Sequence, residues 1–290
     1  MTAGRQLRSM PFRDVTVRAL VVLVLLAAAP ARAQPQIPQP PRTQTPTQTT
    51  VAVALVLAVD TSGSVSNGRF ELQKQGYAAA FRNPQVLSAI RSLDTQSIAV
   101  TMMQWTGPLL HAVAVDWTLI EDEASANAFA AAIAAAPRQL FGGGTSISGA
   151  IDYSRLLLTQ SPFRGARRVI DISGDGSNNR GRPVTQARDE AVQDNIGING
   201  LPILALEPGL DRYYYDNVIG GPGAFMIPAE NYDTFADAIL KKLINEIARL
   251  EPDTNPSPVF DANRGFVSQT RPTLRRSSAS YSQYILGLKR

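Results

Sequence analysis

The stretch VAVALVLAVDTSGSVS, residues 51–66, decides the fold class of this chain. Residues 51–59 are apolar without a break, which is typical of a β-strand covered by protein on both faces. The run ends at Asp60, and the next residues are rich in Ser and Gly, which favour a tight loop. This pattern indicates a strand of a mostly parallel sheet, whose carboxyl end delivers polar side chains to the rim.

Strand and helix patterns alternate from this strand to residue 250. We expect strands at 51–59, 97–105, 110–117, 167–173, 201–206 and 224–228. We expect helices at 69–90, 121–136, 146–159, 184–195, 211–218 and 231–250. Such alternation predicts an α/β domain over residues 51–250, with a doubly wound, mostly parallel central sheet flanked by helices.

The N-terminus has the three parts of a secretory signal peptide. A basic segment (1–18) precedes an apolar run (19–29), and Ala31-Arg32-Ala33 forms a cleavage pattern. The apolar run is shorter than the roughly 20 residues of a membrane-spanning helix, so we favour a cleaved signal at 1–33 over an uncleaved anchor. We expect an exported protein, periplasmic or secreted, with no membrane span in the mature chain.

Two further segments are too polar or too rich in proline to form a core. Residues 34–50 consist almost entirely of Pro, Gln and Thr and are predicted to be an extended linker, and residues 251–290 a disordered basic tail. The net charge of +4 equals that of residues 1–33 alone, which hold five arginines and one aspartate. The remaining residues therefore sum to zero charge, and the predicted domain has no basic patch that would indicate nucleic-acid binding. The absence of cysteine excludes disulfides, thiolate metal sites and a catalytic thiol.

Hydroxyl and carboxylate side chains follow the first strand in the pattern D-x-S-x-S. These are Asp60, Ser62 and Ser64. All three are hard oxygen donors, which suit Mg²⁺, Mn²⁺ or Ca²⁺. Because only one of the three is a carboxylate, the site leaves room for the water ligands that Mg²⁺ tends to keep.

Two other loops are expected to reach the same rim. The run Gly142–Gly144 precedes Thr145 at the start of a predicted helix, and Asp175 follows the predicted strand 167–173. Because the carboxyl ends of parallel strands share one edge of a sheet, these oxygens are predicted to lie near Asp60.

These three pieces resemble the metal-ion-dependent adhesion site of von Willebrand factor A (VWA) domains. Longer stretches, GGGTSISGAID (142–152), RRVIDISGDGSNNRGRPVT (167–185) and VIGGPGAFMIP (218–228), are similar to a family of exported bacterial proteins of unknown function. The family usually has Thr-Asp-Gly where this chain has Gly174-Asp175-Gly176, a departure that keeps the carboxylate.

The resemblance implies a site with a definite ligand set and a definite use. The metal ligands would be Asp60, Ser62, Ser64, Thr145 and Asp175. They would hold Mg²⁺ or Mn²⁺, which would bind an acidic residue of a partner protein. The resemblance implies binding and no catalysis; the oligomeric state stays open.

Two alternatives are a metal-assisted hydrolytic enzyme and a structural VWA domain without metal. The chain has one histidine, His111, on an expected edge strand with apolar neighbours, where a structural role is favoured over a catalytic one. In the polar loop after Asp175, Arg180 and Arg182 could clamp a partner carboxylate or be solvated loop charges. Asp171 lies within a predicted strand and is expected to support the site or to face solvent at an edge.

Overall fold

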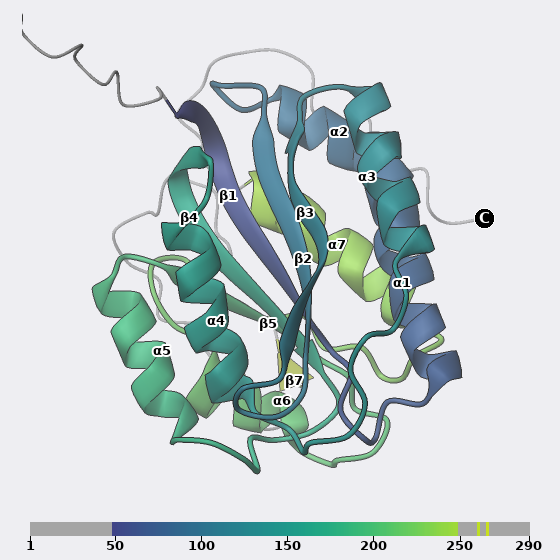
Figure 1. Cartoon of the computed structure of the whole chain (residues 1–290), viewed down its shortest axis with the longest axis vertical. Helices are drawn as coiled ribbons and strands as arrows, with labels where there is room; N and C mark the ends of the chain where they lie inside the picture. Colours follow the sequence, from purple (N-terminus) through teal and green to yellow (C-terminus); the bar gives the residue numbers. More distant parts are fainter. Residues whose placement is uncertain (1–47, 249–259, 262–264, 267–290) are drawn as a thin grey trace, which may run out of the picture. The chain divides into compact units, whose positions relative to one another are not determined.

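The computed structural model describes residues 48–248, 260–261 and 265–266 (Figure 1). The strands are β1 (Thr49–Asp60), β2 (Ile98–Trp105), β3 (His111–Ile120), β4 (Phe163–Gly174), β5 (Gly197–Pro202), β6 (Phe260–Asp261) and β7 (Gly265–Phe266). The helices are α1 (Asn67–Arg82), α2 (Pro84–Arg91), α3 (Glu123–Ala135), α4 (Ile147–Thr159), α5 (Val184–Gln193), α6 (Leu210–Tyr213), the π-helical η1 (Tyr214–Val218) and α7 (Phe235–Ala248). The predicted signal peptide, nearly all of the linker and most of the tail lie outside these residues.

The central sheet has five strands in the order β3-β2-β1-β4-β5. β1 pairs in parallel with both β2 and β4, and β5 pairs in parallel with β4. β3 is antiparallel to β2 and forms one edge. The sequence prediction of a doubly wound, mostly parallel sheet is therefore confirmed, and the strand expected at 110–117 forms an edge.

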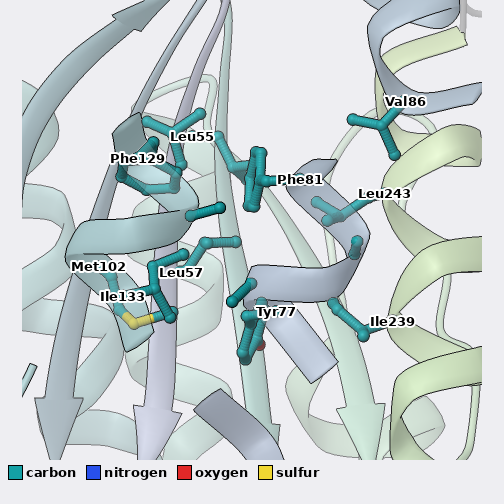
Figure 2. Close-up of a cluster of buried hydrophobic side chains, with 14 of the residues drawn as sticks. Leu55, Leu57, Tyr77, Phe81, Val86, Met102, Phe129, Ile133, Ile239 and Leu243 are labelled. Atoms are coloured by element: carbon teal, nitrogen blue, oxygen red, sulfur yellow. The ribbon is translucent and has the colours of Figure 1, made fainter. Parts of the chain in front are cut away.

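Helices cover both faces of this sheet. On one face, Leu55 and Leu57 of β1 pack among side chains of α1, α2, α3 and α7 (Figure 2). On the other, Val56 and Ala58 belong to a second cluster with α4, α5 and the α6–η1 segment. All four side chains are 0% exposed, because successive residues of a strand point to opposite faces. The apolar residues of β1 are thus buried on both faces of the sheet, as the sequence predicts.

Several predicted elements differ from the structure. The helix expected at 69–90 is interrupted at Asn83, which is extended because Pro84 disfavours helical backbone in the residue before it. The strand expected at 201–206 runs instead from Gly197 to Pro202. Residues 224–228 make only isolated bridges to β5, and α7 begins at Phe235 rather than at 231.

Of the two alternatives for Asp171, exposure to solvent at an edge is wrong, because β4 is an interior strand. Its carboxylate is fully buried and lies 2.7 Å from Nζ of Lys242 on α7. Burial, opposed by Lys242 and reinforced by Glu246, raises the pKa of Asp171 to about 6. Asn199 donates a 2.6 Å hydrogen bond to Glu246, so this buried cluster ties α7 to β4 and β5.

No helix in the part of the chain that the structure describes is both long enough and apolar enough to cross a membrane.

Candidate metal centre

Asp60 lies at the carboxyl end of β1 and is fully buried. Its Oδ1 accepts a 2.6 Å hydrogen bond from the backbone N–H of Ser62, which folds the loop back over the strand end. Its Oδ2 is also buried, but it has no hydrogen-bond partner among the described residues. A buried carboxylate oxygen without a donor is costly, so this atom marks a place where a further group is expected.

The two serines connect Asp60 to the loop after β4. The hydroxyls of Ser62 and Ser64 are 3.1 Å apart, and Ser64 donates a 2.5 Å hydrogen bond to Oδ1 of Asp175. The other carboxylate oxygen of Asp175 accepts a 2.8 Å hydrogen bond from the hydroxyl of Tyr232. Two of the three predicted loops therefore meet through direct side-chain contacts.

Thr145 brings the third loop to the same place. Its backbone carbonyl accepts hydrogen bonds from the N–H groups of Asn179 and Arg180, in the loop that follows Asp175. A Cβ added to Gly176 would lie 3.8 Å from the Thr145 hydroxyl, so that hydroxyl lies directly beside the residue after Asp175. The structure thus assembles all five residues named from the sequence at one rim.

The electrostatics of the rim favour a cation. Burial raises the pKa of Asp60 to about 7, and the nearby charge of Asp175 adds to this effect, while hydrogen bonding by Ser62 and by the backbone of Asp175 opposes it. Burial and the carboxylate of Asp175 raise the pKa of Tyr232 above its ordinary range. Two buried carboxylates close together repel each other unless positive charge compensates them.

The donors fit a hard divalent cation. They are two carboxylates and three hydroxyls, an oxygen-only set that suits Mg²⁺ or Mn²⁺. Nowhere among the described residues do three or more His, Cys, Asp or Glu side chains gather as a metal site, so a cation here would depend on hydroxyl and water ligands.

Several residues of the rim have no counterpart in the sequence prediction. Arg138 donates hydrogen bonds to the carbonyls of Thr61, at 2.9 Å, and Ser62, at 3.3 Å, and so holds the first loop. Arg69 lies 3.8 Å from Asp175 and its guanidinium is stacked on the ring of Tyr232. These contacts come from distant parts of the chain and have no local sequence signature.

Glu207 is a third carboxylate near the rim. Its Oε2 accepts a 2.8 Å hydrogen bond from the N–H of Ser177 and would lie 3.7 Å from a Cβ added to Gly176. A usable signal existed, because Glu207 directly follows the strand expected at 201–206, as Asp60 and Asp175 follow theirs.

The two arginines after Asp175 have different roles. Arg182 is paired with Asp152, at 2.6 Å, and with Glu190, and therefore joins α4 to α5. Arg180 is exposed and makes no ion pair with any described residue. The ring of His111 stacks on Tyr153 at a centroid distance of 4.7 Å, and burial lowers its pKa, a packing role of the kind favoured from the sequence.

Solved structures with a similar fold include adhesins and VWA proteins. The pilus adhesin SpaC from Lactobacillus rhamnosus GG gives a TM-score of 0.50 at 15% identity, over 68% of this chain and 31% of that one. A von Willebrand factor type A protein from Catenulispora acidiphila gives 0.47 at 18% identity, over 68% and 42%. Proximal thread matrix protein 1 from the mussel byssus, with a zinc-occupied MIDAS motif, gives 0.47 at 12% identity, over 68% and 46%.

The chain spans less than half the length of each of these proteins, and at such identities the likeness concerns the fold alone. No curated protein matches the sequence. The family model described as "Protein of unknown function (DUF1194)" matches residues 50–251. The domain has a VWA-like fold, and the chain belongs to the DUF1194 family of proteins of unknown function.

Proposed function

We propose that this protein is an exported binding module that holds a divalent cation, Mg²⁺ or Mn²⁺, and binds an acidic residue of a partner protein through it. The ligands are Asp60, Ser62, Ser64, Thr145 and Asp175, some of them acting through water. The signal peptide on which export depends lies outside the described residues and stays a prediction.

The observation that carries this proposal is the unpartnered, buried Oδ2 of Asp60. An ionised carboxylate oxygen with no donor is strongly disfavoured in a protein interior. A cation beside it would relieve that cost and would also offset the repulsion between Asp60 and Asp175. The hydroxyl pair of Ser62 and Ser64 lies between these two carboxylates in the hydrogen-bond chain and supplies neutral oxygen donors.

A divalent cation in this oxygen set would supply a Lewis-acidic centre with a position for one more anionic ligand. Because the chain contributes only two carboxylates, the complex is not overloaded with negative charge and a partner carboxylate is favoured. Tyr232 and Ser64 hold both oxygens of Asp175 in place, so this carboxylate is oriented before any partner arrives.

The same contacts make hydrolysis a weaker alternative. Metal-assisted hydrolysis needs a base beside an activated water. Both oxygens of Asp175 already accept hydrogen bonds, and Asp60 is needed as a ligand.

Calorimetric titration of the full chain with Mg²⁺ tests the site. We expect saturable binding to the wild type, none to Asp60→Ala, and unchanged binding to the control Asp116→Ala, because Asp116 is exposed on β3. Equal affinity in wild type and Asp60→Ala would end the metal proposal.

A pull-down from a cell-envelope extract, with and without chelator, tests recognition through the cation. Partners retained unchanged in chelator would show that binding does not depend on a metal.

A further inference from the structure

The three glycines before Thr145 form a surface without side chains. Gly142, Gly143 and Gly144 have φ values of 70°, 90° and 83°, a left-handed region that glycine adopts at little cost. The hydroxyl of Thr106 contacts the carbonyl oxygens of both Gly142 and Gly144 and can donate its one hydrogen to either, which holds the run in this shape. We call Gly142–Gly144 the glycine platform. At Gly142 the space that a Cβ would occupy is open, so another chain could approach the backbone there.

Exposed apolar residues contact the platform or are adjacent in sequence to residues that form or contact it. Leu109 is 89% exposed, Phe141 64% and Leu110 44%. A Cβ added to Gly143 would lie 2.7 Å from Cδ1 of Leu110, so this side chain touches the platform. Phe141 precedes Gly142, and Arg138, which also holds the Asp60 loop, stacks on its ring at 4.7 Å. Apolar side chains gathered beside a polar centre are typical of a protein-binding surface.

The side chain of Arg180 borders the glycine platform at Gly144. A Cβ added to Gly144 would lie 2.5 Å from Cγ of Arg180, so the stem of this arginine lies against the glycine. Its guanidinium is exposed and has no ion-pair partner among the described residues, whereas Arg182 is fully engaged with Asp152 and Glu190. An unpaired arginine favours a negatively charged partner.

We propose that the partner presents an acidic residue with an apolar residue next to it in an exposed protein segment. The carboxylate binds the cation, the apolar side chain lies on Leu109 and Phe141, and Arg180 attracts the negative charge of the segment. This inference rests on the proposed function and adds the chemistry of the partner. Charge complementarity supports it, because a divalent cation would offset Asp60 and Asp175, and Arg180 at the same rim has no ion-pair partner among the described residues.

Selection of random peptides displayed on phage against the full chain in Mg²⁺ tests the inference. We expect the enriched peptides to pair Asp or Glu with a neighbouring Leu, Ile or Phe and to be released by chelator. Leu109→Gln and Phe141→Gln should each weaken binding of a selected synthetic peptide by about tenfold, the range of a central apolar contact. Leu156→Gln is the matched control, since Leu156 is 45% exposed on α4, and it should leave binding unchanged.

The outcomes separate the two proposals. Metal-dependent binding of acidic peptides with no apolar preference, or with no effect of Leu109→Gln and Phe141→Gln, would overturn this inference and leave the proposed function standing. Enrichment of peptides without acidic residues, enrichment that persists in chelator, or no enrichment at all would overturn both. Analytical ultracentrifugation of the full chain is a further test. If the chain self-associates and Phe141→Gln abolishes this, the partner that covers the apolar residues is a second copy of the chain, which also overturns the inference.

Discussion

Replacing Asp60 with asparagine should change stability in opposite directions with and without a divalent cation. In the cation-free protein, burial and Asp175 raise the pKa of Asp60 from 3.8 to about 7. At about 1.4 kcal/mol per pKa unit, keeping Asp60 ionised at pH 8 costs the native state up to about 4 kcal/mol relative to the unfolded chain. Asparagine removes that charge.

The substitution preserves much of the local structure. The side-chain oxygen of asparagine can still accept the hydrogen bond from the N–H of Ser62. A buried amide keeps part of the desolvation cost, so we expect a gain of about 2 kcal/mol in chelator. For a domain of this size that gain raises Tm by about 4–8 °C. In Mg²⁺ at about 100 times its dissociation constant, the wild type should gain about 2.7 kcal/mol and the variant almost nothing.

Differential scanning calorimetry at pH 8 in chelator and in Mg²⁺ measures both effects. Asp116→Asn, an exposed position on β3, is the control and should behave as the wild type in both buffers. A lower Tm for Asp60→Asn than for the wild type in chelator would refute the electrostatic reasoning. An equal Mg²⁺ shift in the two proteins would refute the assignment of Asp60 as a ligand.

Three further outcomes follow from other contacts. Lys242→Met should lower the free energy of unfolding in urea by about 3–5 kcal/mol, because it leaves the buried carboxylate of Asp171 without its cation; a loss under about 1 kcal/mol would contradict this. Arg138→Ala should weaken Mg²⁺ binding about tenfold in calorimetry, since it releases the carbonyl of Ser62, and unchanged affinity would show that the loop is held without it. In chelator, Tm should fall as pH rises from about 4 to 7, because the raised pKa values of Asp60 and Asp171 make the native state bind more protons than the unfolded chain in that window. Mg²⁺ should reduce the part of the fall that Asp60 causes. A Tm that rises across this window in chelator would be evidence against the raised pKa.

The sheet and the three candidate loops could be predicted because they depend on periodicity and topology. An unbroken apolar run such as 51–59 specifies double burial, and parallel strands must bring their carboxyl ends to one edge. Asp60 and Asp175 are therefore placed together because each follows a parallel strand, before any side-chain contact is known. Thr145 lies between α3 and α4, and its position follows from the resemblance to VWA domains rather than from a strand end. The resemblance to VWA domains added the ligand set, which periodicity does not specify.

The groups that hold the rim could not be predicted, because each reaches it from a segment remote in sequence. Arg138 lies between α3 and α4, Arg69 on α1, and Tyr232 ahead of α7. The sequence around an arginine or tyrosine in a loop or on a helix surface is the same whether the side chain contacts a binding site or solvent. The errors at Pro84 and in β5 have a different cause, since single-sequence patterns locate elements better than their ends.

The contrast between the two buried aspartates of the sheet supports the proposal that a cation from solvent completes the rim. Asp171 and Asp60 are both fully buried, and burial raises the pKa of both. The fold supplies Asp171 with an ammonium group 2.7 Å away, on Lys242, so its charge is compensated within the chain. Asp60 forms no ion pair with a described residue: its Oδ1 accepts a hydrogen bond from the neutral backbone N–H of Ser62, and its Oδ2 has no hydrogen-bond partner among the described residues. A chain that compensates one buried carboxylate internally and leaves the other open bears a lasting cost in stability at the rim, and a cation taken up from solvent would remove that cost.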